Sequence, residues 1–314
     1  MENILPEHQS GSNCAQEGQE ISASTRIVAV IVAYEPELNN LIALIHELQC
    51  QQVPSVLIDN GTLPPPVIEE LRQIATVIRL DNNEGIAKAQ NIGIAHACSQ
   101  YNAELIIFFD QDSRIDRQFI SGMLKDYEHV TALDKVAAIG PIFTDSRYGF
   151  YYPLIRVNKF GWRTKVQPQG QQIPFEVSML ISSGSIIPVA VLREVGAMNE
   201  QLFIDYVDTE WCLRAISMGY KIYAATSTKM SHAIGDKTIK VFAWHLPVHS
   251  AFRRYYRLRN GWYLARMKHI PPLMKIRENL FNTLHQLLLI ITQPNKRNYL
   301  SIWYRAFKDG VNLK

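Results

Sequence analysis

The sequence predicts an α/β protein whose mainly parallel sheet is flanked by helices, and two observations carry this prediction. Between residues 26 and 109, short β-branched and apolar runs alternate with segments whose apolar residues recur at helical spacing. Apolar residues make up 47% and charged residues 19% of the 314-residue chain, so the chain can bury a sizeable core. Strands that alternate with helices are joined by right-handed crossovers, and such strands form a parallel sheet.

The alternation can be followed element by element. Ile27–Ala33 is a continuous β-branched run, which suits a strand buried on both faces. Apolar residues then recur at helical spacing over 38–48, and Pro36 lies near the helix start. By the same criteria we expect strands at 55–58, 76–80 and 105–109 and helices at 67–75 and 85–99.

The second half of the chain is less regular. Residues 140–172 are aromatic without periodicity, so we expect an irregular segment there. Helices are expected at Val189–Val195 and 208–218, where Gly196 and Gly219 supply stop signals. A strand is expected at 221–225, and the chain after Ala251 has a helical pattern that Pro271-Pro272 interrupts, followed by an amphipathic stretch at 273–291.

Composition divides the chain into three regions. Residues 1–24 are rich in polar residues and glycine, so we expect a disordered N-terminal tail. Residues 25–250 hold the α/β pattern. Residues 251–314 contain 13 Lys or Arg and two Asp or Glu, a charge of +11, which leaves −8 for the rest of a chain with net charge +3. This basic helical region suits an anionic membrane surface, nucleic acid, a helical dimer interface or plain solvation.

Several classes of protein are excluded by what the sequence lacks. Four widely spaced cysteines without a CxxC pair fit a reducing compartment and argue against a structural zinc site. The sequence has no run of about 18 apolar residues, so we expect no membrane-spanning helix. The N-terminus lacks a basic segment followed by an apolar core, so we expect no secretory signal. Neither a P-loop nor a GxGxxG segment is present, so those nucleotide-binding modes have no support.

Acidic residues follow two of the expected strands, where ligands bind in parallel sheets. Asp110 and Asp112 stand one residue apart after strand 105–109, so both carboxylates can reach one hard divalent cation. A strand-ending turn with a helix cap is the alternative. Asp59 ends strand 55–58 and is either a turn residue or an acceptor for the N3–H of a pyrimidine base.

A second acidic cluster lies beside the expected helix 208–218. Asp205, Asp208 and Glu210 stand among apolar and aromatic neighbours, where an unpaired charge is costly. Helix capping and the helix dipole would account for Asp208 and Glu210. Alternatively, the cluster supplies a general base that deprotonates an acceptor hydroxyl. His232 is either a structural residue or a third metal ligand.

Together these residues resemble the inverting glycosyltransferases of family 2, which have the Rossmann-like GT-A fold, and especially the rhamnosyltransferases of bacterial O-antigen and related polysaccharides. The likeness covers about residues 26–265. Its motifs follow one another in family order: 32–36 and 56–62 at the first two strands, 83–93 at a helix start, 109–113 as the DxD site, 203–214 as the acidic motif and 253–260 as a Tyr-rich segment ending in Arg-Asn.

The resemblance implies a role for each candidate residue. Asp208 is expected as the base, with Asp205 as the alternative because Val207 stands where the family commonly has Glu, and Glu210 as a third catalytic candidate. The other expected residues are Ala33, Tyr34, Glu35, Asp59, Asn83, Gly85, Lys88, Asp110 and Gln111 for the nucleotide sugar, Ser183, Gly184 and Trp211 for the acceptor, and Asp112 and His232 for Mg²⁺ or Mn²⁺. For Lys88, a solvated side chain is the alternative.

The resemblance also implies an activity. We expect inverting, metal-dependent transfer of L-rhamnose from dTDP-L-rhamnose to a saccharide, carried on a polyprenyl diphosphate, in lipopolysaccharide O-antigen synthesis. A UDP-sugar donor, such as UDP-galactose or UDP-N-acetylglucosamine, and a catalytically silent sugar- or nucleotide-binding subunit are the alternatives. We expect a cytoplasmic protein, peripheral on the inner membrane through the basic region or dimeric through it. Nucleic acid is not an expected partner, because it would leave Asp59, Asp112 and Asp208 unexplained.

Overall fold

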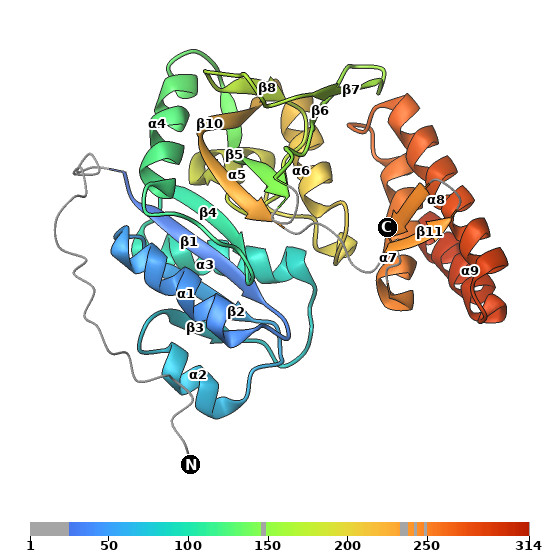
Figure 1. Cartoon of the computed structure of the whole chain (residues 1–314), viewed down its shortest axis with the longest axis horizontal. Helices are drawn as coiled ribbons and strands as arrows, with labels where there is room; N and C mark the ends of the chain where they lie inside the picture. Colours follow the sequence, from blue (N-terminus) through green and yellow to red (C-terminus); the bar gives the residue numbers. More distant parts are fainter. Residues whose placement is uncertain (1–24, 146–148, 233–237, 242–243, 248–249, 314) are drawn as a thin grey trace.

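The computed structural model describes residues 25–145, 149–232, 238–241, 244–247 and 250–313 (Figure 1). The expected tail at 1–24 lies outside these residues. An eight-stranded sheet forms the centre, in the order β3-β2-β1-β4-β9-β5-β10-β8. Its parallel strands are β1 (Ile27–Ala33), β2 (Ser55–Asp59), β3 (Thr76–Arg79), β4 (Leu105–Asp110), β5 (Val136–Asp145) and β10 (Lys221–His232); β8 (Phe175–Val177) and β9 (Ile186–Pro188) run antiparallel. The mainly parallel sheet is therefore confirmed.

Helices cover both faces of the sheet (Figure 1). One core layer contains α1 (Leu38–Cys50), α2 (Pro65–Leu71) and α4 (Phe119–Thr131), and the other contains α3 (Ile86–Tyr101), α5 (Val189–Val195) and α6 (Val207–Ser217). Successive residues of β1 alternate between the layers: Ile31 packs with the first and Val30 with the second. Burial on both faces explains why the strand has no polar residue.

Local signals end two of the helices, and the sequence predicts the end of α5. α5 stops at Gly196, whose φ of 92° is available to glycine at little cost. Helix α3 ends at Asn102 in the left-handed region, the other residue type that this position favours. Gly93 lies where α3 crosses β1, and an added Cβ would come within 2.3 Å of Val30 Cγ1. This glycine therefore sets how closely α3 approaches the sheet.

The expectation of an irregular segment at 140–172 is wrong. β5 continues to Asp145, and β6 (Leu154–Val157) pairs with β7 (Arg163–Val166) as an antiparallel hairpin. The sheet accommodates Pro141 at a shift in register, because Gly140 pairs with Ala224 and Ile142 with Lys229. β10 pairs with β5 on both sides of this shift, so it extends beyond the expected strand 221–225. Neither α4 nor β5 was predicted from the sequence.

Helices also form the C-terminal region, beside the central sheet (Figure 1). They are α7 (Ala251–Arg266), α8 (Pro272–Thr292) and α9 (Lys296–Asn312). The break at Pro271-Pro272 is confirmed, since Pro272 occupies the first turn of α8. The remaining elements are the 3-10 turn η1 (Glu200–Leu202) and the paired strands β11 (Thr238–Val241) and β12 (Trp244–Pro247). Within the described residues, no helix combines the length and apolar character needed to cross a bilayer.

Candidate active site

The ends of β1, β2 and β4 meet at one edge of the sheet. Ala33 pairs with Asp59 and Val32 pairs with Asp110, so the candidate residues that follow these strands are direct neighbours. The loops are tied together: Tyr34 N donates to Gln111 Oε1 at 2.6 Å, and Glu35 N donates to Thr62 Oγ1 at 2.9 Å. The predicted meeting of strand ends at one rim is confirmed.

Asp59 is fully buried, and its two carboxylate oxygens differ. Oδ1 accepts hydrogen bonds from the backbone N–H groups of Thr62 at 3.0 Å and Leu63 at 3.1 Å. Oδ2 accepts no hydrogen bond from the described residues and lies 3.9 Å from Arg79 Nε. Oδ1 thus stabilises the turn at residues 59–63, as expected if Asp59 is a turn residue. Oδ2 can still accept a hydrogen bond from a ligand. Arg79 was missed, although it pairs with Asp59 in the β-ladder.

The segment at 83–93 connects this edge to the rest of the site. Asn83 Oδ1 accepts from Asn60 Nδ2 and from Gly85 N, both at 3.0 Å. Gly85 has a φ of 83°, and an added Cβ would lie 2.6 Å from the Phe203 ring. Asn83 and Gly85 therefore hold the loop before α3 closely against residue 203. Lys88 pairs with Glu84 at 2.8 Å, and this contact raises the pKa of Lys88.

Two other carboxylates lie near enough to Asp110, at the end of β4, to affect its charge. Burial, followed by the charges of Asp112 and Asp208, raises the pKa of Asp110 to about 6, while Arg253 opposes this shift. Asp208 lies on α6 and Asp112 lies exposed beyond β4, so the edge of the sheet and the acidic helix share one site. Arg253 is a further residue of this site; it belonged to the motif at 253–260 but had no predicted role.

The two candidate bases have different surroundings. Burial raises the pKa of Asp208, against a hydrogen bond that its Oδ1 accepts from Thr209 N at 2.8 Å. Asp205 is paired with two cations: Arg253 Nη2 lies 3.3 Å and Arg257 Nη1 lies 3.5 Å from its Oδ1. Asp205 is thus neutralised locally, whereas Asp208 lies within electrostatic range of Asp110.

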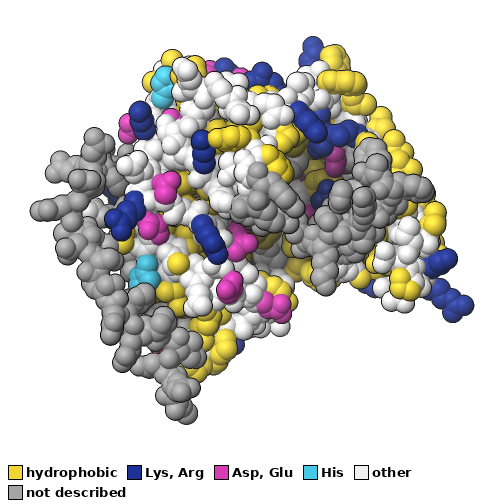
Figure 2. Space-filling model, in the orientation of Figure 1, with side chains coloured by type: hydrophobic (Ala, Val, Ile, Leu, Met, Phe, Trp, Pro, Cys, Tyr) yellow, Lys and Arg dark blue, Asp and Glu magenta, His cyan; other side chains and the backbone are white. Residues whose placement is uncertain are grey.

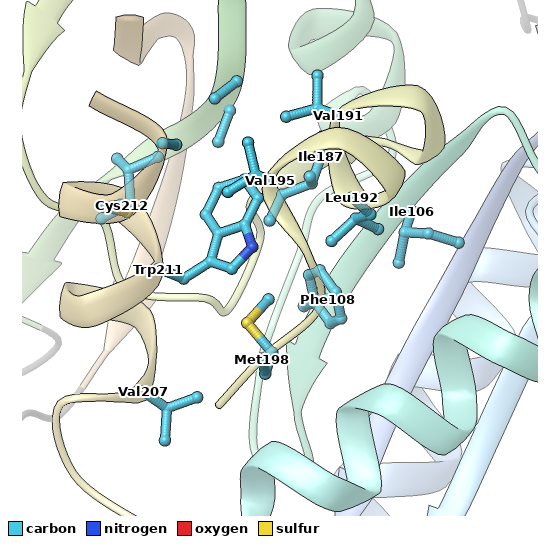
Figure 3. Close-up of a cluster of buried hydrophobic side chains, with 14 of the residues drawn as sticks. Ile106, Phe108, Ile187, Val191, Leu192, Val195, Met198, Val207, Trp211 and Cys212 are labelled. Atoms are coloured by element: carbon cyan, nitrogen blue, oxygen red, sulfur yellow. The ribbon is translucent and has the colours of Figure 1, made fainter. Parts of the chain in front are cut away.

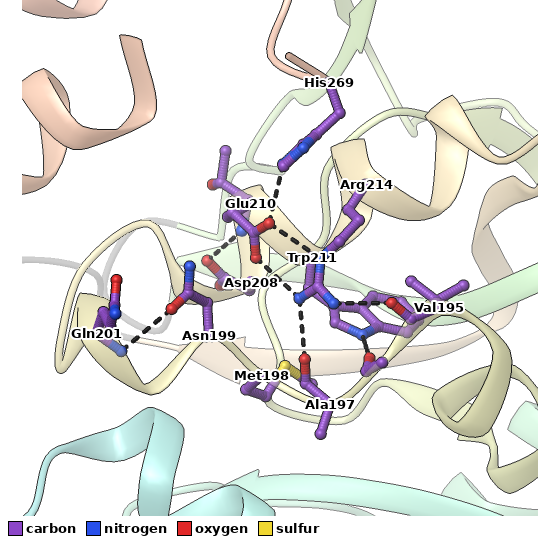
Figure 4. A network of polar contacts seen from close by, with 12 residues as sticks. Val195, Ala197, Met198, Asn199, Gln201, Asp208, Glu210, Trp211, Arg214 and His269 are labelled. Atoms are coloured by element: carbon purple, nitrogen blue, oxygen red, sulfur yellow. Dashed lines mark hydrogen bonds and ion pairs between the residues drawn. The ribbon is translucent and has the colours of Figure 1, made fainter. Parts of the chain in front are cut away.

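Glu210 faces a different direction (Figure 4). Its carboxylate lies 3.0 Å from Arg214 Nη2 and 2.9 Å from His269 Nε2, and Arg214 also donates to the carbonyls of Val195 and Ala197. Burial acts to raise the pKa of Glu210, but hydrogen bonds from His269 and Arg214 outweigh it and lower the pKa. The arrangement ties α6 to the loop after α5 and to the α7–α8 connection.

The three residues expected at the acceptor site are all buried. Trp211 is 1% exposed in the core between β4, α5 and α6 (Figure 3), and its Nε1 donates to Gly196 O at 2.8 Å. Ser183 Oγ lies 2.7 Å from Ser113 Oγ, and Gly184 adopts a φ of 75° against Met230. Trp211 therefore packs in the core, and Ser183 contacts the turn at 110–113 from its buried side. None of them is exposed in this structure, and their expected contact with the acceptor stays a prediction.

The donor atoms at the end of β4 fit a hard cation. Asp110 and Asp112 offer only oxygen atoms, which suit Mg²⁺ or Mn²⁺, and such ions commonly take one or two carboxylates together with substrate phosphates. The described residues contain no group of three His, Cys, Asp or Glu side chains that could hold a metal without a substrate. The side chain of His232 lies outside the described part of the structure.

Comparisons with known proteins agree with this geometry. The sequence model of Glycosyl transferase family 2 matches residues 28–196. The chain is 46% identical over 290 residues to dTDP-rhamnosyl transferase RfbF of Shigella flexneri, covering 92% of this chain and 96% of that protein.

Solved structures share the fold at low identity. GalNAc-T7 with UDP, GalNAc and Mn²⁺ has a TM-score of 0.56 at 14% identity, over 87% of this chain and 59% of that one. S. aureus TarS 1-349 in complex with UDP-GlcNAc has a TM-score of 0.52 at 14% identity, over 91% and 80%. These likenesses confirm the expected GT-A fold.

We expect Glu210→Gln to lower the free energy of unfolding by about 2–4 kcal/mol at pH 7, because Arg214 then loses its buried counter-charge. Since the pKa of Glu210 is lower in the folded protein, its contribution is present above the unfolded value of 4.5 and is lost as pH falls below it. Urea unfolding at pH 7 and pH 4 measures this difference.

The matched control is Glu69→Gln, because Glu69 pairs with Arg72 at an exposed surface and should change stability by less than about 0.5 kcal/mol. Equal stabilities for Glu210→Gln and the parent at pH 7 would show that the contacts of Glu210 contribute nothing to the fold.

Proposed function

The chain belongs to glycosyl transferase family 2, and we propose that it is an inverting transferase that moves L-rhamnose from dTDP-L-rhamnose to a saccharide hydroxyl. The relative from Shigella flexneri, 46% identical over 92% of this chain, supports the donor because it is named a dTDP-rhamnosyl transferase. The observation that carries the proposal is that Asp59 and Asp110 lie at one edge of the sheet, on the two strands that flank β1, and that Asp112 and Asp208 raise the pKa of Asp110.

We propose that the nucleotide base binds at the ends of β1 and β2. Asp59 Oδ2 is a buried acceptor that takes part in no described hydrogen bond, and a pyrimidine N3–H would satisfy it. Tyr34 is 44% exposed and Glu35 follows it, so this loop can cover the base and ribose. Ala33 and Gln111 hold the loop in place, since Ala33 pairs with Asp59 and Gln111 bonds to Tyr34.

The diphosphate would lie at the end of β4. Asp112 and Asp110, with His232 as a third candidate, would hold Mg²⁺ or Mn²⁺, and the bound ion would neutralise charge on the leaving diphosphate. Within the chain itself, Arg253 pairs with Asp205 and acts against the raised pKa of Asp110. Asn83 and Gly85 shape the neighbouring loop, and Lys88 is at the start of α3.

Asp208 is the residue that we propose as the general base. Its raised pKa brings it closer to neutral pH, where a general base is most effective. It would take the proton from the acceptor hydroxyl while that oxygen attacks the anomeric carbon and the nucleoside diphosphate departs. One displacement of this kind inverts the anomeric configuration. Asp205 is less suited, because two arginines already pair with it.

A panel of nucleotide sugars with Mn²⁺ tests the donor and the base together. We expect release of dTDP from dTDP-L-rhamnose in the presence of a lipid-linked acceptor, and much less release from UDP-galactose or UDP-N-acetylglucosamine. Asp208→Asn should keep donor affinity and lose most of the turnover, by about 100-fold or more. Preference for a UDP-sugar would reject rhamnose, and normal turnover by Asp208→Asn would reject the base.

The role of Asp112 is tested by calorimetry with the donor product dTDP. We expect Asp112→Ala to weaken metal-dependent binding at least about 10-fold, because one carboxylate ligand is removed. Asp116→Ala is the matched control, since Asp116 lies four residues along the same loop and its Oδ1 only accepts from Gln118 N. Unchanged affinity of Asp112→Ala with Mg²⁺ and with Mn²⁺ would remove Asp112 from the metal site.

We further propose that the acceptor is a polyprenyl-diphosphate-linked saccharide of O-antigen synthesis and that the C-terminal helices rest on the cytoplasmic face of the inner membrane. α8 has an exposed apolar face, and the hydrophobic side chains gather along this edge of the molecule (Figure 2). The residues of the face recur every three or four positions and are 37–70% exposed: Leu273, Ile276, Leu280, Leu284, Leu287 and Ile291.

In the C-terminal helices, the acidic side chains point inward and many basic side chains are exposed. Both acidic residues of the region point inward: Glu278 pairs with Arg163 at 3.0 Å, and Asp309 accepts from Tyr255 Oη at 2.5 Å. Exposed cations remain outside: Arg266, Lys268, Lys296, Arg297, Arg305 and Lys308. An apolar face with cations and no free acid suits an anionic bilayer surface, to which each basic residue adds about 1 kcal/mol.

Liposome flotation tests the membrane role. The full chain should float with vesicles that contain phosphatidylglycerol, and the double variant Leu280→Glu with Leu284→Glu should lose most of this binding. Leu133→Glu is the control, because Leu133 is 70% exposed just after α4. A parent chain that does not float but is dimeric by light scattering, and monomeric in the double variant, would replace the membrane with a homodimer interface.

A further inference from the structure

The segment directly before Asp208 has a backbone that ordinary residues avoid. Phe203, Asp205 and Tyr206 have φ values of 63°, 61° and 67°, and none of them is a glycine. Positive φ values are uncommon outside glycine and persist only where the surroundings impose them. Since Val207 begins α6, this segment determines where the first turn of α6, and with it Asp208, is placed.

One side chain of α7 contacts most of the segment. Asn260 is fully buried, and its Nδ2 donates to the carbonyls of Leu202 at 2.8 Å, Ile204 at 2.8 Å and Asp205 at 3.1 Å. An amide nitrogen has two N–H groups, so one of them is shared between two carbonyls. Both N–H groups of the Asn260 side chain are therefore bonded to three carbonyls within residues 202–205.

The orientation of the Asn260 amide is itself fixed. Its Oδ1 accepts from Arg259 Nε at 3.0 Å and Nη2 at 2.8 Å, and Arg259 Nη2 also donates to the carbonyls of Gln201 and Leu202. With the oxygen occupied by a guanidinium, only the nitrogen can face the segment. Arg259 and Asn260 together thus donate to the carbonyls of residues 201, 202, 204 and 205.

Side chains of the segment are held on both sides. The Phe203 ring stacks on Tyr256 of α7 with centroids 4.5 Å apart, and Ile86 N of α3 donates to Phe203 O at 2.8 Å. Tyr206 Oη donates to Glu278 at 2.9 Å and accepts from Asn282 Nδ2 at 2.9 Å, both on α8. The segment is therefore clamped between α3 and the C-terminal helices.

We infer that Asn260 is a positioning residue for the transfer reaction: it holds residues 202–206, including the left-handed backbone at Phe203, Asp205 and Tyr206, so that Asp208 faces the donor site. The inference rests on the proposed role of Asp208 as the base. Asn260 acts through the backbone and contacts neither base nor cation site, so its loss should reduce turnover while leaving nucleotide binding at the β1, β2 and β4 ends intact.

The test compares Asn260→Ala with Asn279→Ala in the full chain. Asn279 is a matched control, because its Nδ2 joins α8 to α7 through the carbonyl of Gly261 at 2.9 Å without touching the segment. We expect Asn260→Ala to lower kcat about 10- to 100-fold, as small misplacements of a catalytic group do. The Kd for dTDP should change less than about twofold, and Asn279→Ala should keep kcat despite a lower melting temperature.

Asn260→Ser keeps one donor and provides the test if Asn260→Ala does not fold; its kcat should lie between those of the parent and the alanine variant. Folded variants with the parent kcat, or a loss of kcat that Asn279→Ala shares at equal melting temperature, would overturn the positioning role. If Asp208→Asn is active, the proposed base is wrong; if Asp208→Asn is inactive while both Asn260 variants turn over normally, only the positioning role fails.

Discussion

Repulsion between carboxylates crowded at the end of β4 is the constraint on which the arrangement of the site depends. Asp110 has a pKa of about 6 because it is buried and then because Asp112 and Asp208 lie near it. Such crowding destabilises the folded chain, so it persists only where compensating charge is near. Arg253 supplies part of that charge, and a cation bound with the diphosphate of the donor would supply the rest.

The C-terminal helices contact the acidic segment and also offer a candidate surface for the bilayer. The family match ends at residue 196, before the acidic helix begins. Beyond that point, α7 and α8 supply Arg253, Asn260 and Asn282, which bind the acidic residues or the segment before them. Glu278 joins three parts of the molecule, because it bonds both Arg163 of the β6–β7 hairpin and Tyr206.

Sequence reasoning recovered the parts of the fold and site that depend on local pattern. β1 and α5 have the predicted bounds, because a β-branched run and a helix closed by Gly196 are local signals. The position of Asp59 and Asp110 at the same edge of the sheet followed from the rule for parallel strand ends. The strand through Pro141 was missed because only the register shift of β10 permits it. The burial of Trp211 was missed because an aromatic residue beside acids has the same pattern in a core as at a surface.

The strained segment at 203–206 has a consequence for how this protein can be recombined with its relatives. Its conformation is encoded in two distant places, the segment itself and the Arg259-Asn260 pair more than fifty residues later. A chimera with a crossover between them would inherit a loop from one parent and its hydrogen-bond donors from the other. Exchange of acceptor specificity by domain shuffling would therefore succeed only when both stretches come from the same parent. The parent that supplies the residues between them would not change this requirement.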